Sequence, residues 1–225
     1  EIGVLQPITE IGSFCRRKGI AFHTDAAQAL GYLDLEPDKS RIDFMSLSAH
    51  KIYGPKGVGA LVIRDELALE PSQYGGGQEL GLRSGTLPVP LIVGFAKAVE
   101  ITKNDQDKRN KRLLFLRNLL LDGLKKNISG LIVNGSINQR LPHNLNITFP
   151  GVNGSQLHGQ LRKYIFCTSG SACSNGEASH VLKEIGLCKK DAEASIRMSV
   201  GRNTTEKDIK EAIGIITKIV NNLIQ

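Results

Sequence analysis

Short apolar runs in the first third of the chain predict β-strands, because each run is too short for a helix and is bounded by glycine or polar residues. The runs cover residues 20–23, 42–47 and 58–63. A helix is predicted ahead of the first strand, opening at Pro7 and stopping at Gly19. Strands that alternate with helical or irregular segments are typical of an α/β layer with a largely parallel sheet.

The rest of the chain alternates longer helical patterns with short strands. Two closely spaced prolines precede a helical pattern over about 91–126, which is broken near 104–107. Thr204 or Thr205 is expected to cap a final helix. Further strands are predicted at 144–149 and 196–200, and a further helix at 156–164. The prolines mark a candidate boundary between two domains.

Length and composition favour a globular chain with a real core. The 225 residues suit one large domain or two small ones, and 40% of them are hydrophobic and 23% charged. No apolar run reaches the roughly 18 residues of a membrane span, and no signal-peptide pattern is visible. We expect no membrane association. The chain begins at Glu1 without a methionine, so we expect it to be a piece of a longer protein.

The cysteines and the charge distribution indicate which cellular compartment and which class of binding partner to expect. The four cysteines form no Cys-x-x-Cys pair, so a structural zinc site is not expected. We expect reduced thiols and a cytoplasmic protein. The net charge is +7, and much of the excess lies within 103–126. That stretch is a helical pattern without a nucleic-acid-binding motif, so a solvated helix face or a dock for an acidic protein is favoured over nucleic acid.

A lysine at the end of a predicted strand is the first candidate for chemistry. Ser48, His50 and Lys51 follow the 42–47 strand, and a glycine-rich turn comes behind them. A lysine held beside hydroxyl and imidazole groups suits a Schiff base with a carbonyl cofactor. Taken alone, the position is more typical of a surface lysine at a strand end.

An acidic residue after the strand predicted at 20–23 is a second candidate for chemistry. Asp25 lies at the end of an apolar strand, where a carboxylate needs a cationic partner. Gln28 follows three residues later. In pyridoxal-phosphate enzymes such an acid holds the proton on the ring nitrogen. The commoner role of a lone aspartate is a helix N-cap.

Two glycine- and serine-rich segments complete the candidates. The first contains Thr86 in Arg-Ser-Gly-Thr, which suits an anion site or an ordinary surface loop. The second contains Cys173 within Ser-Gly-Ser-Ala-Cys-Ser. Reactive cysteines occupy exposed polar surroundings, which fits Cys173, whereas Cys167 follows apolar residues and Cys15 lies on an apolar helix face.

Four motifs in order carry a resemblance to a known family. They are His-Thr-Asp-Ala-Ala-Gln, Ser-Ala-His-Lys-Ile-Tyr-Gly-Pro-Lys-Gly, Arg-Ser-Gly-Thr and Ser-Gly-Ser-Ala-Cys-Ser. With them the chain resembles the cysteine desulfurases of the NifS/IscS type, pyridoxal-phosphate enzymes of the class V aminotransferase superfamily. Family members carry further residues ahead of this segment. The resemblance implies that 1–96 is the second half of the cofactor-binding large domain and that 97–225 is a smaller α+β domain.

The resemblance also implies roles for individual residues. Lys51 would form the internal aldimine with pyridoxal 5'-phosphate, and Cys173 would receive sulfur as a persulfide. Arg197 would bind the substrate carboxylate. The other expected cofactor contacts are Asp25 at the ring nitrogen, Gln28 at the ring hydroxyl, Ser48 and His50 at the phosphate, and Thr86 at the phosphate of a neighbouring subunit.

The expected reaction converts L-cysteine to L-alanine in a homodimer and passes sulfur to an iron–sulfur scaffold or another acceptor protein. The alternatives are another class V lyase, which cleaves selenocysteine or cystine, and a non-catalytic interaction fragment. His158, His180 and Arg197 are unranked candidates for the group that activates Cys173.

Overall fold

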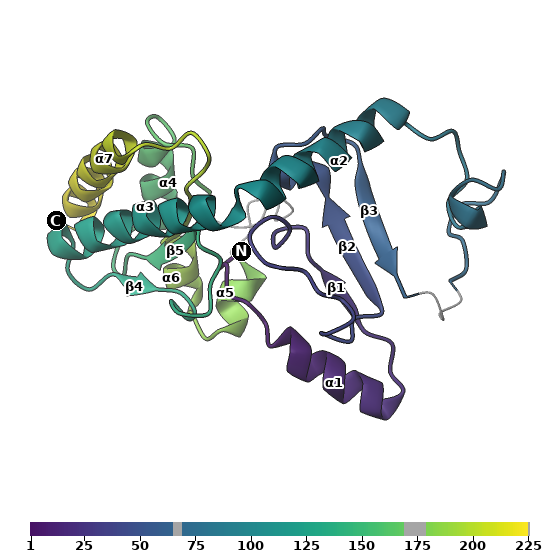
Figure 1. Cartoon of the computed structure of the whole chain (residues 1–225). Helices are drawn as coiled ribbons and strands as arrows, with labels where there is room; N and C mark the ends of the chain where they lie inside the picture. The colour runs from purple at the N-terminus through teal and green to yellow at the C-terminus, as the bar shows by residue number, and fades with distance from the viewer. Residues whose placement is uncertain (65–68, 169–178, 225) are drawn as a thin grey trace. The chain divides into compact units, whose positions relative to one another are not determined.

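The computed structural model describes residues 1–64, 69–168 and 179–224 (Figure 1). The chain divides into two compact units. The first, here called the C-terminal unit, comprises Glu1–Leu5 and Asp107–Gln225. The second, the N-terminal unit, comprises Gln6–Gln106. No helix in the described ranges is both long and apolar enough to cross a membrane.

The N-terminal unit is built on a sheet whose strand order is β1-β2-β3. Strand β1 pairs in parallel with β2, and β2 pairs antiparallel with β3. The elements are α1 (Ile8–Lys18), β1 (His23–Asp25), β2 (Phe44–Ser48), the 3-10 turn η1 (Ala49–Ile52), β3 (Gly59–Ile63), the 3-10 turn η2 (Glu79–Gly81) and α2 (Val89–Asn104). The α/β class is therefore confirmed, although this sheet is mixed rather than mainly parallel.

The antiparallel step follows from the short connection between β2 and β3. A parallel pairing needs a crossover of a dozen or more residues, usually a helix. Here the chain turns back at once: the Gly54 N–H donates to the Ala49 carbonyl over 3.0 Å, and the Ala49 N–H donates to the Val58 carbonyl over 3.3 Å.

A buried carboxylate joins the three strands at one end. Asp43 is 5% exposed; its Oδ2 accepts from the Phe22 N–H over 2.8 Å, and its Oδ1 lies 2.7 Å from Arg64 Nε. This contact explains why regular pairing of β1 begins at His23, three residues later than the apolar pattern predicts. The carboxylate receives the Phe22 N–H, which would otherwise be free at the strand start.

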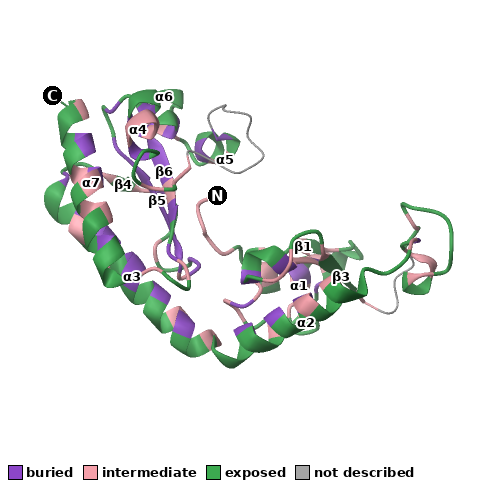
Figure 2. Ribbon diagram, turned by 90° about the horizontal axis from the view of Figure 1, so that it is seen from above, coloured by how far each residue is buried: buried purple, intermediate pink, exposed green. Residues whose placement is uncertain are grey.

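The C-terminal unit contains a fully antiparallel sheet in the order β4-β5-β6. Strand β5 is buried along its whole length, as Figure 2 shows in purple. The elements are α3 (Gln106–Asn127), β4 (Ile132–Val133), β5 (Asn144–Thr148), α4 (Gly154–Leu161), α5 (His180–Glu184), α6 (Lys189–Glu193), β6 (Ser195–Ser199) and α7 (Glu206–Ile224). The predicted break near 104–107 is confirmed, because α2 ends at Asn104 and α3 begins at Gln106.

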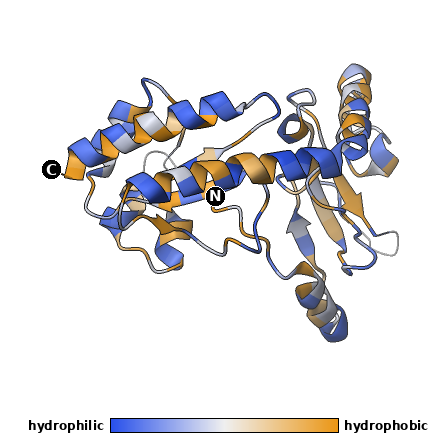
Figure 3. Ribbon diagram, turned by 60° about the vertical axis from the view of Figure 1, so that its left-hand side comes forward, coloured by the Kyte–Doolittle hydropathy of each residue, from blue (hydrophilic) through white to orange (hydrophobic). Residues whose placement is uncertain are grey.

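Two amphipathic helices supply much of the core of this unit. Helix α3 buries a stripe of leucines, and α7 buries Ile209, Ile216, Ile219 and Val220. Alternating orange and blue bands along the helix that ends at C in Figure 3 show this amphipathic pattern. The predicted cap is confirmed at Thr205, whose Oγ1 accepts from the Asp208 N–H over 3.2 Å while the Asp208 carboxylate accepts from the Thr205 N–H over 2.8 Å.

Two glycines of α4 form a matched pair for a stability test. A Cβ at Gly154 would lie 2.1 Å from the Glu193 carbonyl oxygen, whereas a Cβ at Gly159 would meet nothing within 4 Å. We expect Gly154→Ala to destabilise the chain by about 1–3 kcal/mol through overpacking. Gly159→Ala should stabilise it by about 0.5–1 kcal/mol, because alanine is the better helix former. Urea unfolding of the two variants checks this, and equal effects would contradict it.

The buried His143 predicts a pH dependence of stability. It is 8% exposed, and burial lowers the pKa of His143 from 6.5 to about 4. Between these pH values the unfolded chain binds a proton that the folded chain does not, so stability rises with pH there. The contribution is complete above pH 6.5 and is lost as the pH falls towards 4, by about 3 kcal/mol in all.

Urea unfolding at several pH values between 7 and 4 measures this effect, with His143→Asn as the control. Burial also lowers the pKa of His158, but that residue is present in both proteins and its contribution cancels in the difference. The variant should lose less stability than the wild type on acidification, and identical pH dependence in the two would sink the assignment to His143.

Candidate functional site

The parallel pairing of β1 with β2 brings the predicted catalytic segments to one sheet edge. Asp25, the last residue of β1, lies opposite Ser46, and β2 continues to Ser48. Because the strands are parallel, both end at the same edge, which is where α/β sheets bind ligands. The sheet thus brings together, at this edge, the ends of β1 and β2, which lie more than twenty residues apart in sequence.

The two faces of this sheet differ in chemistry. Side chains alternate between faces along a strand, so four polar side chains share one face. They are His23, Asp25, Ser46 and Ser48. The opposite face carries Met45 and Leu47, and Met45 forms a buried cluster with Ala26 and Ile42. The face with Met45 anchors the sheet, and the other face, which also carries Phe44, presents the four polar side chains.

A hydrogen bond on the polar face links the two strands. His23 Nε2 and Ser46 Oγ are 2.8 Å apart. Neither residue was predicted as part of the site. His23 could have been identified from its position near Asp25 in the motif His-Thr-Asp. Ser46 is recognised as part of the site only from the register of β1 against β2.

Asp25 is exposed and caps a turn. Its Oδ1 accepts from the Ala27 N–H over 2.8 Å, and the Ala26 N–H donates to the Ser46 carbonyl over 2.9 Å. The following residues form tight turns rather than an α-helix, so Asp25 is no helix N-cap. Among the described residues its Oδ2 has no hydrogen-bond partner. Gln28, three residues on, is also exposed.

The turn after β2 presents Lys51 outward. Within η1, Ala49 and Ile52 are buried and pack with Phe95 and Ala98 of α2, while His50 and Lys51 are exposed. Lys51 Nζ makes no hydrogen bond or ion pair with any residue that the structure describes. The apolar pair fixes the turn, and the side chains of His50 and Lys51 are left accessible.

Ser48 and His50 are already oriented toward one another. Ser48 Oγ and His50 Nδ1 are 2.9 Å apart, across the junction of β2 and η1. The two side chains precede Lys51 directly and offer a hydroxyl and an imidazole for an anionic ligand. A phosphate contact of Ser48 and His50, which the resemblance implies, stays a prediction.

The glycine-rich loop before α2 is closed by its own side chains. Ser84 is 5% exposed, and its hydroxyl donates to the Gly76 carbonyl over 2.9 Å. Arg83 donates to the Ser84 carbonyl over 2.6 Å, and Gln78 Oε1 accepts from the Gly85 N–H over 3.1 Å. Ser84 and Gln78 therefore hold the loop together, and Thr86 remains exposed.

Arg197 lies on β6 of the C-terminal unit, half-buried, with its backbone paired on both sides. Asn146 of β5 is its cross-strand partner. On the other side the Arg197 N–H donates to the Thr168 carbonyl over 2.8 Å. In the described part of the chain the guanidinium makes no hydrogen bond or ion pair, so five donors are available for an anion.

Cys173, the predicted sulfur acceptor, lies outside the described residues. Of the other cysteines, Cys15 and Cys167 are half-buried and Cys188 is exposed. Burial raises the pKa of the Cys167 thiol, which disfavours the thiolate. The sulfur of Cys188 accepts from the Asp191 N–H at the start of α6.

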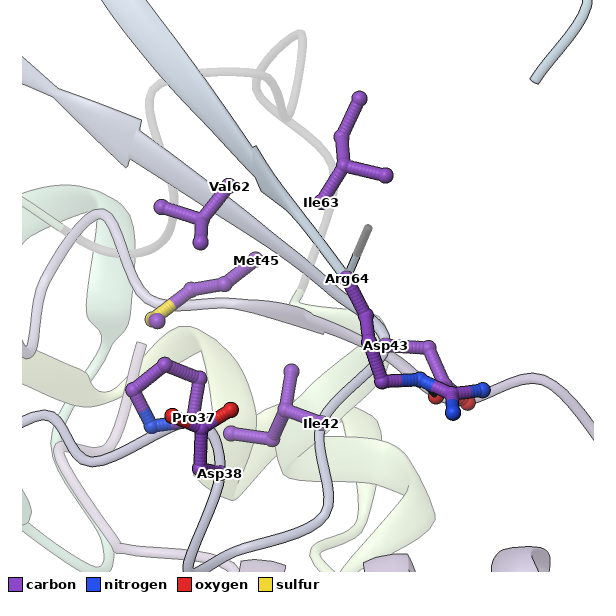
Figure 4. Close-up of a pocket in the computed structure, with 8 residues that line it drawn as sticks. All are labelled: Pro37, Asp38, Ile42, Asp43, Met45, Val62, Ile63 and Arg64. Carbon is purple, nitrogen blue, oxygen red and sulfur yellow. Dashed lines mark ion pairs between the residues drawn. The ribbon is translucent and has the colours of Figure 1, made fainter. Parts of the chain in front are cut away.

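Figure 4 shows a pocket that contains none of the predicted site residues. It is lined by Ile42, Met45 and the Asp43–Arg64 ion pair, among others. Asp43 precedes β2 and Arg64 follows β3, so this pocket lies at the end of the sheet opposite to Ser48. Its charges are paired across the ends of the strands, which marks it as part of the packing rather than of the site.

Comparison with known proteins agrees with the motifs. The model of the family "aminotransferase class-V" matches residues 1–211. The chain is 48% identical over 227 residues to the cysteine desulfurase IscS of Vibrio vulnificus strain CMCP6, covering 99% of this chain and 56% of the relative. It is 43% identical to the IscS of Rickettsia rickettsii strain Iowa, with 99% and 55% covered.

Solved structures show the same fold. A NifS-like protein superposes with a TM-score of 0.88 at 34% identity, covering 99% of this chain and 59% of the other. A NifS-like protein from Rickettsia africae ESF-5 gives 0.88 at 32% identity, with 98% and 59% covered. The chain spans little more than half the length of the curated relatives it matches. The resemblance drawn from the four motifs is confirmed, and the chain belongs to the aminotransferase class-V family.

Proposed function

We propose that the full-length protein containing this chain is a cysteine desulfurase, which converts L-cysteine to L-alanine and transfers sulfur to Cys173 as a persulfide. The carrying observation is the polar edge of the β1–β2 sheet, where Asp25 and the Ser48–His50–Lys51 turn come together. The names of the relatives, cysteine desulfurases at 43–48% identity, support the same reaction.

Pyridoxal 5'-phosphate is the cofactor of the class V family, and the donors at this edge fit it. When bound, it supplies an electron sink for the carbanion that forms at the substrate Cα. Lys51, whose Nζ makes no hydrogen bond or ion pair with any described residue, would hold its aldehyde carbon. Ser48 and His50 would bind its phosphate, Gln28 its ring hydroxyl, and Thr86 the phosphate held by a second copy of the chain.

Asp25 is the residue that sets the charge at the ring nitrogen. Its Oδ1 is engaged by the Ala27 N–H, which fixes the carboxylate in place, while Oδ2 stays available. A carboxylate beside a pyridine nitrogen favours the protonated form, because opposite charges at short range stabilise one another. Asp25 therefore holds a proton at that atom.

Arg197 is the proposed site for the substrate carboxylate. Its guanidinium offers a planar fork that matches a carboxylate with two parallel hydrogen bonds. Within the described residues no acidic side chain occupies it. The strand pairings on both sides of Arg197 fix the backbone from which this fork projects.

Cys173 takes the sulfur, as its place in the Ser-Gly-Ser-Ala-Cys-Ser motif implies, and Cys167 is poorly suited to that role. Only a thiolate attacks sulfur, and burial disfavours the thiolate of Cys167. The candidates for the group that promotes the thiolate of Cys173 are His158, His180 and Arg197. Of these, His158 is half-buried with a pKa lowered by burial, so it is neutral near pH 7 and can accept a proton.

The wider assignments are part of the same proposal. Residues 1–96 belong to the cofactor-binding large domain and 97–225 to the small domain. The protein acts as a homodimer in the cytoplasm and delivers sulfur to an iron–sulfur scaffold or another acceptor protein. The exposed Thr86, in a loop that its own side chains close, supports a shared site between two copies.

Lys51→Ala tests the cofactor assignment, with Lys56→Ala as a control because Lys56 is exposed in the same connection. In the full-length protein Lys51→Ala should lose the visible absorbance of covalently held cofactor. Alanine production should fall by about 10²–10⁴-fold, since the lysine also moves protons. Lys56→Ala should keep both properties. Normal turnover in Lys51→Ala would refute the role.

Cys173→Ser separates desulfurase from other lyase chemistry. The variant should still bind cofactor and L-cysteine but release almost no alanine or sulfide, because serine cannot accept the sulfur. Cys188→Ser, at an exposed cysteine, should retain full activity. Retained activity in Cys173→Ser, or persulfide found on Cys167 or Cys188 by peptide mass after a single turnover, would overturn the assignment.

A further inference from the structure

The polar face of the β4–β5–β6 sheet is buried, which is costly unless its groups are bonded to one another. Four of its polar side chains are almost completely covered: Asn134 is 2% exposed, and Asn146, Thr148 and Ser195 are 0% exposed. Alternation along β5 and the register against β6 place Asn146, Thr148, Ser195 and Arg197 on this one face. Of these, only Arg197 is not fully buried.

Hydrogen bonds connect the four buried side chains. Asn134 Nδ2 donates to Asn146 Oδ1 over 2.7 Å and to Thr148 Oγ1 over 2.8 Å. Thr148 Oγ1 and Ser195 Oγ are 2.7 Å apart. The Asn134 N–H also donates to the Asn146 carbonyl over 2.9 Å. A buried network that is bonded in this way holds its members in one arrangement.

Within this network, Asn146 is the residue that lies directly opposite Arg197 on the neighbouring strand. In the β5–β6 ladder the Val200 N–H donates to the His143 carbonyl, and the Phe149 N–H donates to the Ala194 carbonyl. Hydrogen-bonded and non-bonded pairs alternate along an antiparallel ladder, so Asn146 and Arg197 form a non-bonded pair. In such a pair the side chains approach most closely, with Cβ atoms about 4.5–5.5 Å apart.

The other side of Arg197 is also held. The Arg197 N–H donates to the Thr168 carbonyl over 2.8 Å, and the Thr168 N–H donates to the Arg197 carbonyl over 3.4 Å. The backbone of Arg197 is thus fixed, and the freedom that remains lies in its long side chain. On the face that Arg197 shares with the network, the residue directly opposite it is the buried Asn146.

We propose that Asn146 is a positioning residue, which restricts the Arg197 side chain to the orientation that receives a carboxylate. The inference rests on the proposed function for the identity of the ligand, an α-amino acid. Asn146 itself need not touch the ligand. Restricting a long side chain before binding raises affinity, because less freedom is lost when the ligand arrives.

The first experiment needs no activity and uses the full-length protein. Nuclear magnetic resonance relaxation of the Arg197 Nε–Hε group reports how ordered the side chain is. Asn146→Ala should lower this order, and Thr148→Val, one pair further along the same network and opposite Ser195, should leave it unchanged. Equal order of Arg197 in wild type and Asn146→Ala would overturn the proposal.

Asn146→Asp provides a change of opposite sign. It keeps an acceptor for Asn134 Nδ2 even where the alanine variant does not fold, and it loses only the Nδ2 donor to the Glu1 carbonyl, 3.5 Å away. The new carboxylate would pair with the Arg197 guanidinium, so the order of Arg197 should rise while carboxylate ligands bind more weakly. An Arg197 side chain that is indifferent to Asn146→Asp would count against the close approach.

The second experiment measures ligand binding by the full-length protein with cofactor bound. L-alanine is the probe, because it carries the carboxylate and does not react further. Its Kd and the KM of L-cysteine should rise about three- to tenfold in Asn146→Ala, with kcat within about twofold. Asn146→Asp should raise both by more than about tenfold, since an ion pair must be broken.

Thr148→Val separates positioning from simple stability. It lowers the stability of the same network but should leave the Kd of L-alanine within about twofold of wild type. Equal rises in Kd for Thr148→Val and Asn146→Ala would overturn the proposal. If the wild type forms no alanine from L-cysteine, the proposed function fails, while the order of Arg197 still decides whether Asn146 positions it.

Discussion

The buried carboxylate of Asp43 is the contact on which the N-terminal unit depends. It accepts from the Phe22 N–H ahead of β1, itself precedes β2, and pairs with Arg64 after β3. One side chain thereby aligns the ends of three strands. A buried charge is tolerated only when it is paired and hydrogen-bonded, and loss of one partner typically costs about 3–5 kcal/mol. With the strands aligned at this end, their opposite ends form the polar edge that carries Asp25 and Ser48.

Both units use a two-faced sheet to separate anchoring from chemistry. In the N-terminal unit the apolar face packs in the core, and the other face presents His23, Asp25 and Ser48. In the C-terminal unit the polar face is itself buried and bonded into a network, and Arg197 is its half-exposed member. In the proposed function, the first arrangement leaves groups accessible for the cofactor, and the second restricts Arg197 for the substrate carboxylate.

Sequence patterns located most of the long elements, because amphipathic periodicity survives in any context. Helix α1 with its stop at Gly19, the break between α2 and α3, and the Thr205 cap are confirmed. Strand limits moved by one to three residues, since side-chain contacts such as Asp43 to Phe22 settle where pairing begins. Strand β4, only two residues long, and the short helices α5 and α6 carry too few residues to show a period.

The sequence by itself determined the chemistry: which residues carry a carboxylate, a lysine, an arginine and a thiol, and in which motifs. Their motif order was enough to indicate the family, because such motifs are local and need no fold to be read. Only the tertiary structure decided which groups meet. The pairing of His23 with Ser46, the loop closure by Gln78 and Ser84, and the place of Asn146 opposite Arg197 all depend on strand register and burial. These arise from contacts between residues distant along the chain, and no local pattern encodes them.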